Sequence, residues 1–214
     1  MNRFMTIFLA LVMSTGCSPK LESNETVEDD QQVDIGNNDT TEEEEAQGSD
    51  IHGGSPANVT WNDCGGMIDD HPCDFSLVDQ YGDTFTLYDN YGKLIVLDFS
   101  TMWCSVCNNI AHDAQVFMDD YGNQNFLWVT VLIDANAYGV APSEQDVIDW
   151  ANLYGIDDAP VVAGNRSLID LTAESGWPVS SWPTLVILDR TMIIKYGING
   201  WNESTIRGWV ETEL

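Results

Sequence analysis

The sequence has few basic side chains, few histidines, and no apolar stretch long enough to cross a membrane. Of its 214 residues only 7 are lysine or arginine, against 35 acidic residues, so the formal net charge is −28. A chain this negative repels phosphate backbones, which excludes binding to nucleic acid through a basic surface. The 3 histidines, His52, His71 and His112, have no spacing that completes a zinc site, so we expect no metal and no other cofactor.

The first residues have the features of a secretory signal. Arg3 supplies a positive charge, Phe4–Met13 is an apolar run, and the small residues Ser14–Gly16 precede Cys17. A membrane-spanning helix needs about 20 apolar residues, and this run is about half that length. The pattern therefore favours a signal peptide over a permanent transmembrane anchor, which is the alternative.

Ser14–Cys17 (STGC) resembles the lipobox of bacterial lipoproteins, in which a cysteine after a small residue receives the lipid. The resemblance implies a signal peptide over residues 1–16 and lipidation of Cys17. The mature protein would then be lipid-anchored to the inner or outer membrane of the bacterial cell envelope and face the periplasm. Ser14 departs from the family, which usually has an aliphatic residue there, and without lipidation Cys17 would leave with the signal or remain a free thiol.

Residues 17–60 contain few of the large apolar side chains that a folded segment buries. Between Ser18 and Thr60 stand 12 acidic residues against the single Lys20. This composition predicts a disordered, self-repelling coil. We interpret it as an acidic tether that holds a folded domain, residues 61–214, away from the membrane; an acidic binding arm is the alternative.

Residues 61–214 alternate strand-like and helix-like hydrophobic patterns, which predicts an α/β layer fold. Near-continuous apolar runs at Lys93–Phe99 and Phe126–Ile133 predict strands that are covered on both faces. The last two expected strands would form a hairpin, which makes the sheet mixed. Other strands are expected near 161–162, at 184–188 and at 192–196, and helices from 104 to 121, from 143 to 154, around 168–175 and from about 203.

Two cysteines three residues apart, in Trp103–Cys107 (WCSVC), lie where the first strand meets its helix. A helix N-terminus offers unpaired N–H groups and a positive dipole end, which stabilise a thiolate on Cys104. Cys107 lies one turn further into the helix, where it would resolve a mixed disulfide. The pattern predicts dithiol–disulfide exchange through a Cys104–Cys107 redox disulfide, with a zinc site and a purely structural disulfide as alternatives.

Val96–Cys107 (VLDFSTMWCSVC) and Trp182–Asp189 (WPTLVILD) together resemble the thioredoxin superfamily, and most closely its envelope-anchored TlpA-like and ResA-like thiol–disulfide oxidoreductases. Phe75–Gly82 (FSLVDQYG), with Leu87 and Gly92–Lys93 after it, is similar to the N-terminal hairpin of that subfamily. The resemblance implies a thioredoxin-like three-layer sandwich: a central mixed β-sheet flanked by helices, plus the hairpin. Ser105 and Val106 replace the Gly-Pro that thioredoxins usually carry, so no redox potential can be carried over.

The resemblance also implies that Pro183 follows a cis peptide bond and lies with Trp182 against the cysteine pair. An ordinary trans proline that opens an edge strand is the alternative. Trp103, next to Cys104, is interpreted as a surface residue that shields the thiols and contacts partners, or else as a core aromatic without a chemical role.

Asp98 lies six residues before Cys104, at the position of the buried acid in thioredoxins. A carboxylate inside an apolar strand is costly unless it is well paired or functional. Burial would raise its pKa and let it exchange protons with Cys107 near neutral pH. An outward-facing Asp98 paired with a lysine is the alternative.

The remaining cysteines, Cys64 and Cys73, flank a short loop just before the first expected hairpin. In an oxidising compartment they most simply form a structural disulfide that pins the N-terminal segment of the domain. A second redox-active pair that relays electrons to the first is the alternative.

The sequence thus predicts a monomeric, membrane-tethered oxidoreductase that exchanges disulfides with envelope proteins and with an upstream electron donor or acceptor. A non-catalytic thioredoxin-like binding or structural lipoprotein is one alternative, because fold alone does not imply function. A thiol peroxidase is another: Thr101 stands three residues before Cys104 as in peroxiredoxins, although Leu97 replaces the proline of that motif. The domain has 23 acidic and 5 basic residues, which favours basic or neutral clients.

Overall fold

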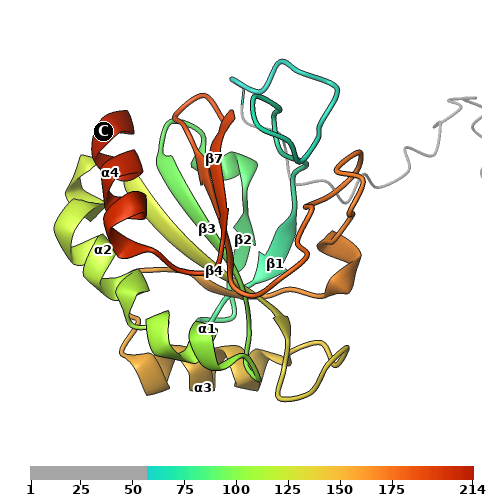
Figure 1. Ribbon diagram of the computed structural model, residues 1–214, viewed down its shortest axis with the longest axis vertical. Helices are drawn as coiled ribbons and strands as arrows, with labels where there is room; N and C mark the ends of the chain where they lie inside the picture. The colour runs from blue at the N-terminus through green and yellow to red at the C-terminus, as the bar shows by residue number, and fades with distance from the viewer. Residues whose placement is uncertain (1–56) are drawn as a thin grey trace, which may run out of the picture. The chain divides into compact units, whose positions relative to one another are not determined.

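The computed structural model describes residues 57–214, which fold around a five-stranded mixed sheet with the strand order β5-β4-β3-β6-β7 (Figure 1). The two longest strands lie side by side and run parallel, and all their residues are buried, as their apolar sequences predict. β5 pairs parallel with β4. On the other side of β3, β6 pairs antiparallel with β3, and β7 pairs antiparallel with β6. The strands are β3 (Leu94–Thr101), β4 (Phe126–Asp134), β5 (Val161–Ala163), β6 (Thr184–Leu188) and β7 (Ile194–Asn199).

The pairing register brings several strand ends together at one end of the sheet. Asp98 on β3 pairs with Thr130 on β4, and Phe99 pairs with Thr184, the first residue of β6. Thr184 in turn pairs with Asn199, the last residue of β7. The loops that follow β3 and β4 and the loop that precedes β6 therefore converge at this end.

Four helices supply one side of the core: α1 (Ser105–Ile110), α2 (Asp113–Tyr121), α3 (Glu144–Tyr154) and α4 (Glu203–Glu213). Their buried side chains pack in one cluster with the sheet residues Val96, Trp128 and Leu185. α3 begins at a capping box, in which the Ser143 hydroxyl accepts from the Asp146 N–H while the Asp146 carboxylate accepts from Ser143. Figure 1 shows α2 and α4 on the opposite side of the sheet from β1.

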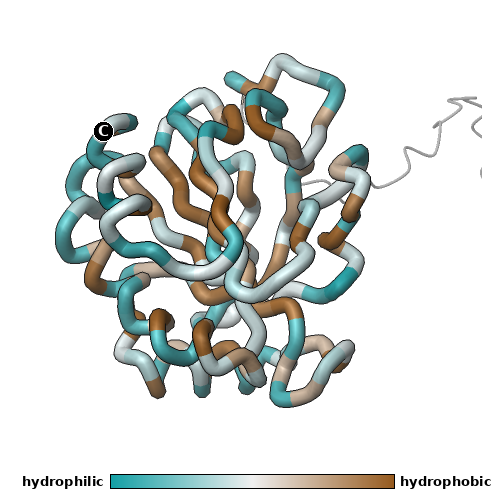
Figure 2. Tube along the Cα trace, viewed as in Figure 1, coloured by the Kyte–Doolittle hydropathy of each residue, from teal (hydrophilic) through white to brown (hydrophobic). Residues whose placement is uncertain are grey.

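The other face of the sheet is covered by a hairpin and short turns. β1 (Ser76–Val78) and β2 (Thr84–Thr86) pair antiparallel, as expected for the N-terminal hairpin. Phe85, Leu87 and Trp177 pack there against alternate residues of the central strands. The hydrophobic residues of these strands lie between the two layers (Figure 2). The remaining turns are the 3-10 helices η1 (Tyr88–Asn90), η2 (Gly122–Gln124) and η3 (Arg166–Leu168).

The expected mixed α/β sandwich is confirmed, but the expected single helix from 104 to 121 is wrong in detail. α1 ends at Ile110 and α2 begins at Asp113. Ala111 and His112 keep right-handed helical dihedrals, and the chain tightens there, with Ala114 N–H donating to the Ala111 carbonyl at 3.4 Å.

The helix expected around 168–175 is wrong: the only helical turn is η3, which ends at Leu168. The Asp170 carboxylate accepts hydrogen bonds from the backbone N–H and the hydroxyl of both Thr172 and Ser175. Such local side-chain bonds offer the backbone an alternative to a helix. The last strand also starts later than expected, at Ile194, because Met192 has a φ of 60° that no regular strand accommodates.

The predicted signal peptide, the lipidated Cys17 and nearly all of the predicted tether lie outside the described residues, so they stay predictions. Within residues 57–214, none of the helices has both the length and the apolar character needed to span a membrane.

Candidate functional site

Cys104 and Cys107 lie at the junction of β3 and α1. Cys104 is the N-cap residue of α1, and its Sγ accepts a hydrogen bond from the Cys107 N–H at 3.2 Å. Both thiols are free. Cys104 retains 8% of its accessible surface and Cys107 retains 0%, so an approaching sulfur atom reaches Cys104 first.

Asn108, which the sequence analysis did not identify, fixes the loop that carries Cys104. Its side-chain amide donates to the carbonyls of Met102 at 2.9 Å and Cys104 at 2.7 Å. Its side-chain oxygen accepts from the Tyr154 hydroxyl on α3. These bonds satisfy the carbonyls on both sides of Trp103 and tie the start of α1 to α3.

Asp98 is buried, so the outward-facing, lysine-paired alternative is wrong. Val96, two residues earlier on β3, packs in the same cluster as Cys104 and Cys107, so Asp98 faces that side of the sheet. Its Oδ1 accepts a hydrogen bond from the Ser100 hydroxyl at 2.7 Å. Burial raises the pKa of Asp98 to about 7, the Ser100 bond opposes this rise, and the charge of Asp113 adds to it. Asp98 is therefore poised to gain or lose a proton near neutral pH.

Cys107 is strongly disposed to keep its proton. Burial raises the pKa of the Cys107 thiol, and so do its hydrogen bond with Cys104 and the nearby charge of Asp98. A backbone hydrogen bond from Thr101 acts in the opposite direction but does not outweigh them. Cys107 thus needs a proton acceptor before it can act as a nucleophile, and Asp98 is close enough to affect its titration.

The Trp182–Pro183 peptide bond is cis, so the trans alternative is wrong. Trp182 packs against the helix-side core cluster that contains Cys104 and Cys107. The Pro183 carbonyl accepts from the Gly200 N–H at 2.7 Å, which joins the loop before β6 to the loop after β7. Trp182 and Pro183 therefore lie at the same end of the sheet as the cysteine pair.

Trp103 is a surface residue, with 42% of its area exposed, and not a core aromatic. Its indole N–H donates to Oδ2 of Asp134, the last residue of β4, at 3.1 Å. Arg166 also binds Asp134 with two of its nitrogen atoms. Asp134 and Arg166 were not among the predicted site residues. The one signal in the sequence was an acidic residue at the end of the apolar run 126–133.

Cys64 and Cys73 form a disulfide, as expected. The loop between them is attached to the start of β7: the Asp69 N–H donates to the Ile194 carbonyl, and the Ile194 N–H donates to the Asp70 carbonyl, both at 2.9 Å. Cys64 is exposed and Cys73 is half-buried. The disulfide therefore closes a loop on the sheet, at a distance from α1 along the chain.

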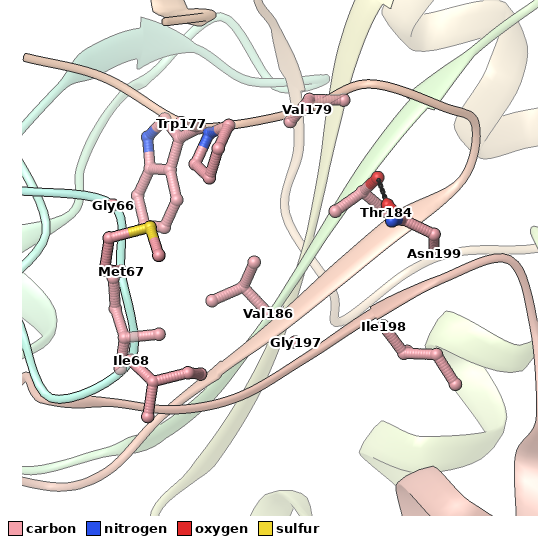
Figure 3. Close-up of a pocket in the computed structure, with 12 residues that line it drawn as sticks. Gly66, Met67, Ile68, Trp177, Val179, Thr184, Val186, Gly197, Ile198 and Asn199 are labelled. Carbon is pink, nitrogen blue, oxygen red and sulfur yellow. Dashed lines mark hydrogen bonds between the residues drawn. The ribbon is translucent and has the colours of Figure 1, made fainter. Parts of the chain in front are cut away.

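A pocket of about 230 Å³ lies between this loop and the face of β6 and β7. Figure 3 shows Met67 and Ile68 on one side of it and Thr184, hydrogen-bonded to Asn199, on the other. Most lining residues are apolar, and none of the four described cysteines is among them. The pocket is thus separate from the Cys104–Cys107 pair.

The central strand β3 of a mixed sheet leads into a helix that begins with a CxxC motif, and a cis-proline precedes the neighbouring strand β6. This is the arrangement of the thioredoxin superfamily, and the expected membership in it is confirmed. More narrowly, the family model described as the AhpC/TSA family matches residues 68–197. This match covers more than half of the chain and includes Cys104, Cys107 and Pro183, so the chain belongs to the AhpC/TSA family.

Several solved structures are similar to this chain. The exposed lipoprotein thioredoxin Etrx1 of Streptococcus pneumoniae is 27% identical, with a TM-score of 0.53, over 66% of this chain and 100% of that one. A thioredoxin family thiol:disulfide interchange protein of Chlorobium tepidum is 18% identical, with a TM-score of 0.54, over 72% and 97%. A DsbF homologue of Corynebacterium diphtheriae is 18% identical, with a TM-score of 0.54, over 65% and 84%. No match was found among curated proteins.

Proposed function

We propose that this protein is a thiol–disulfide oxidoreductase, tethered by a lipid on Cys17 to a membrane of the bacterial cell envelope, which exchanges disulfides with envelope proteins. The observation that carries the proposal is the arrangement of three groups: the Cys104 thiol, on a residue that retains 8% of its accessible surface, the fully buried Cys107 thiol and the buried Asp98 carboxyl. The names of the similar structures, an interchange protein and a lipoprotein thioredoxin, support the reaction class and the tether respectively.

In the direction that reduces a client, Cys104 acts first because it is the less buried of the two cysteines. Its thiolate attacks one sulfur of the client disulfide, the client S–S bond breaks, and the second client sulfur leaves as a thiolate that takes up a proton. The product is a mixed disulfide between Cys104 and the client. The N–H of Cys107 points at the Cys104 sulfur and holds it at the start of α1 in this step.

Resolution requires Cys107 to lose its proton, and Asp98 is the proposed acceptor. The Cys107 thiolate attacks the Cys104 sulfur, the Cys104–client bond breaks, and the client leaves as a thiolate that takes up a proton from the solvent, while Cys104 and Cys107 form a disulfide. With a pKa of about 7, Asp98 can take up the proton from Cys107 and later return it to the solvent. The reverse sequence of steps would oxidise a client dithiol, and an upstream donor or acceptor would restore the starting state.

The test is turnover against a model protein disulfide, with the parent protein compared with Cys104→Ser. We expect exchange in the parent and none above background in the variant. The double variant Cys64→Ser/Cys73→Ser is the matched control, since it removes the other cysteine pair and should keep exchange. Activity that persists in Cys104→Ser would contradict the proposal, and hydroperoxide consumption without disulfide exchange would favour the thiol peroxidase instead.

Two further measurements address the tether and the direction of electron flow. Mass spectrometry of the membrane fraction should show acylated Cys17, and an unmodified N-terminus that begins elsewhere would contradict the lipid anchor. The reduction potential of the Cys104–Cys107 couple distinguishes a reductant near thioredoxin, at about −270 mV, from an oxidant near −120 mV.

A further inference from the structure

The Asp134 carboxylate connects three segments beside the cysteine pair. It accepts hydrogen bonds from the Trp103 indole, from the Arg166 guanidinium and from the Gly139 backbone N–H. Burial alone would raise the pKa of Asp134, but these donors outweigh it and hold the pKa below its ordinary range. The carboxylate therefore stays charged and fixes the loop before Cys104, the loop after β4 and the turn after β5 relative to one another.

The loop after β4 presents an exposed tyrosine next to Trp103. Tyr138 is 75% exposed, and its ring centroid lies 6.5 Å from that of Trp103. The Arg166 guanidinium lies over the Tyr138 ring, 3.8 Å from its centroid. The loop itself is closed by the Ala135 N–H bond to the Val140 carbonyl at 2.7 Å. Tyr138 and Trp103 thus form an aromatic shelf, held by Arg166 and Asp134, beside Cys104.

The surroundings of this shelf differ in charge from the rest of an acidic domain. Residues 102–112, 135–143 and 176–183 contain no aspartate, glutamate, lysine or arginine, although the domain has 23 acidic and 5 basic residues. The charges of Asp134 and Arg166 are paired with each other. An uncharged client segment can therefore approach Cys104 without placing its backbone against carboxylates.

We propose that the aromatic shelf of Trp103 and Tyr138 is a client-recognition surface that receives an aromatic side chain next to the client's reactive cysteine. The inference rests on the proposed disulfide exchange and adds to it the class of client segment. Tyr138 is the specificity-determining residue, because it is exposed and free to contact a partner. Asp134 and Arg166 are positioning residues, which act through Tyr138 and Trp103.

The experiment uses two synthetic peptides, each with one internal disulfide, that differ only in the residue before the first cysteine: phenylalanine in one and glycine in the other. The full-length protein carries Cys107→Ser, so that the mixed disulfide on Cys104 accumulates and can be counted by mass spectrometry after acid quenching. The rate constant for the phenylalanine peptide divided by that for the glycine peptide gives a preference ratio. This ratio isolates recognition, because the disulfide chemistry is the same in both peptides.

We expect a preference ratio above one, which Tyr138→Ala lowers by about three- to ten-fold, the effect of losing one aromatic contact. Tyr81→Ala is the matched control. Tyr81 is 65% exposed, and its hydroxyl donates to the Asp157 carbonyl ahead of β5, at the far end of the sheet. The ratio in Tyr81→Ala should equal that of the background protein.

Arg166→Lys tests the positioning role, because lysine keeps the charge but loses the planar two-point contact and the stacking on Tyr138. It should lower the preference ratio in part, mainly by raising the concentration of phenylalanine peptide at which mixed-disulfide formation reaches half of its maximal rate. An unchanged ratio in Tyr138→Ala, with mixed disulfide still forming, would overturn the recognition surface alone. Mixed disulfide with neither peptide would overturn the proposed exchange and this inference with it. A change in sedimentation in Tyr138→Ala without a change in ratio would assign the shelf to self-association and overturn the inference.

Discussion

The two cysteine pairs of this domain lie in different surroundings. Cys64 and Cys73 lie in a loop attached to the edge strand, with Cys64 exposed and no buried carboxyl among the hydrogen-bond partners of that loop. Cys104 and Cys107 lie at the start of a helix, above a buried acid whose pKa is about 7.

In the proposed function, the groups next to each cysteine pair decide which pair is the redox centre. Cys104 and Cys107 have a helix start, unequal burial and the buried Asp98 carboxyl beside them. The pair in the loop has backbone attachments to β7 instead, which suit a brace. The four variants below test this division, in order of decreasing expected effect.

Replacing the resolving thiol should have the largest effect. In Cys107→Ser, Cys104 can still attack a client disulfide but the mixed disulfide cannot be resolved from within the protein. Turnover should fall by about 1,000-fold, and the mixed disulfide should accumulate on non-reducing gels. The matched variant Cys73→Ser should accumulate no mixed disulfide; if it traps clients equally well, the two pairs do not differ as proposed.

Asp98→Asn should change how stability depends on pH. The folded-state pKa of about 7 lies above the ordinary value of 3.8, so the native state holds more protons than the unfolded state between these values. The parent protein therefore loses stability as pH rises from about 4 to above 7, by about 4 kcal/mol from this group. Asp98→Asn should lack that loss. Guanidinium denaturation at pH 4 and pH 8 measures the free energy of unfolding of both proteins. If the parent and the variant differ in this free energy by the same amount at both pH values, the raised pKa of Asp98 is contradicted.

Removing the disulfide of the loop should reduce stability rather than exchange. In the chain-entropy model, a disulfide that closes a loop of about ten residues contributes about 2–3 kcal/mol. Cys64→Ala/Cys73→Ala should lower the free energy of unfolding by that amount, measured by urea denaturation. The brace interpretation fails if the double variant is as stable as the parent while its exchange rate drops.

Ser100→Ala should have the smallest effect, because it removes one hydrogen bond and leaves both cysteines in place. The Ser100 hydroxyl favours the charged form of Asp98, so its loss should raise the pKa of Asp98 further above 7. The pH–rate profile of mixed-disulfide resolution should shift to higher pH by about one unit. Thr101→Ser, which keeps a hydroxyl, is the control; overlaying profiles of Ser100→Ala and the parent would exclude proton transfer through Asp98.

Local sequence patterns predicted most of the sheet and the position of the cysteine pair at the start of a helix. β3 and β4 were predictable because their apolar runs are long, and Cys104, Cys107 and Asp98 lie within one short segment. The helix expected around 168–175 was wrong, because Asp170 binds Thr172 and Ser175 through its side chain in a way that hydrophobic spacing does not reveal.

The aromatic shelf could not be predicted for a different reason. Trp103 and Arg166 lie 31 and 32 residues from Asp134 in sequence, and the three meet only because β4 ends next to β3 and β5. Contacts of this range follow from strand order and register, which local patterns do not specify. An acid at the end of a buried strand was visible in the sequence, but its partners were not.

The attachment of the disulfide loop to β7 has a consequence for association. β7 is an edge strand, and an edge strand with free backbone groups can pair with the strand of another molecule. The loop occupies both the N–H and the carbonyl of Ile194, at the point where this edge begins. The Cys64–Cys73 bond therefore keeps part of the sheet edge capped against intermolecular strand pairing.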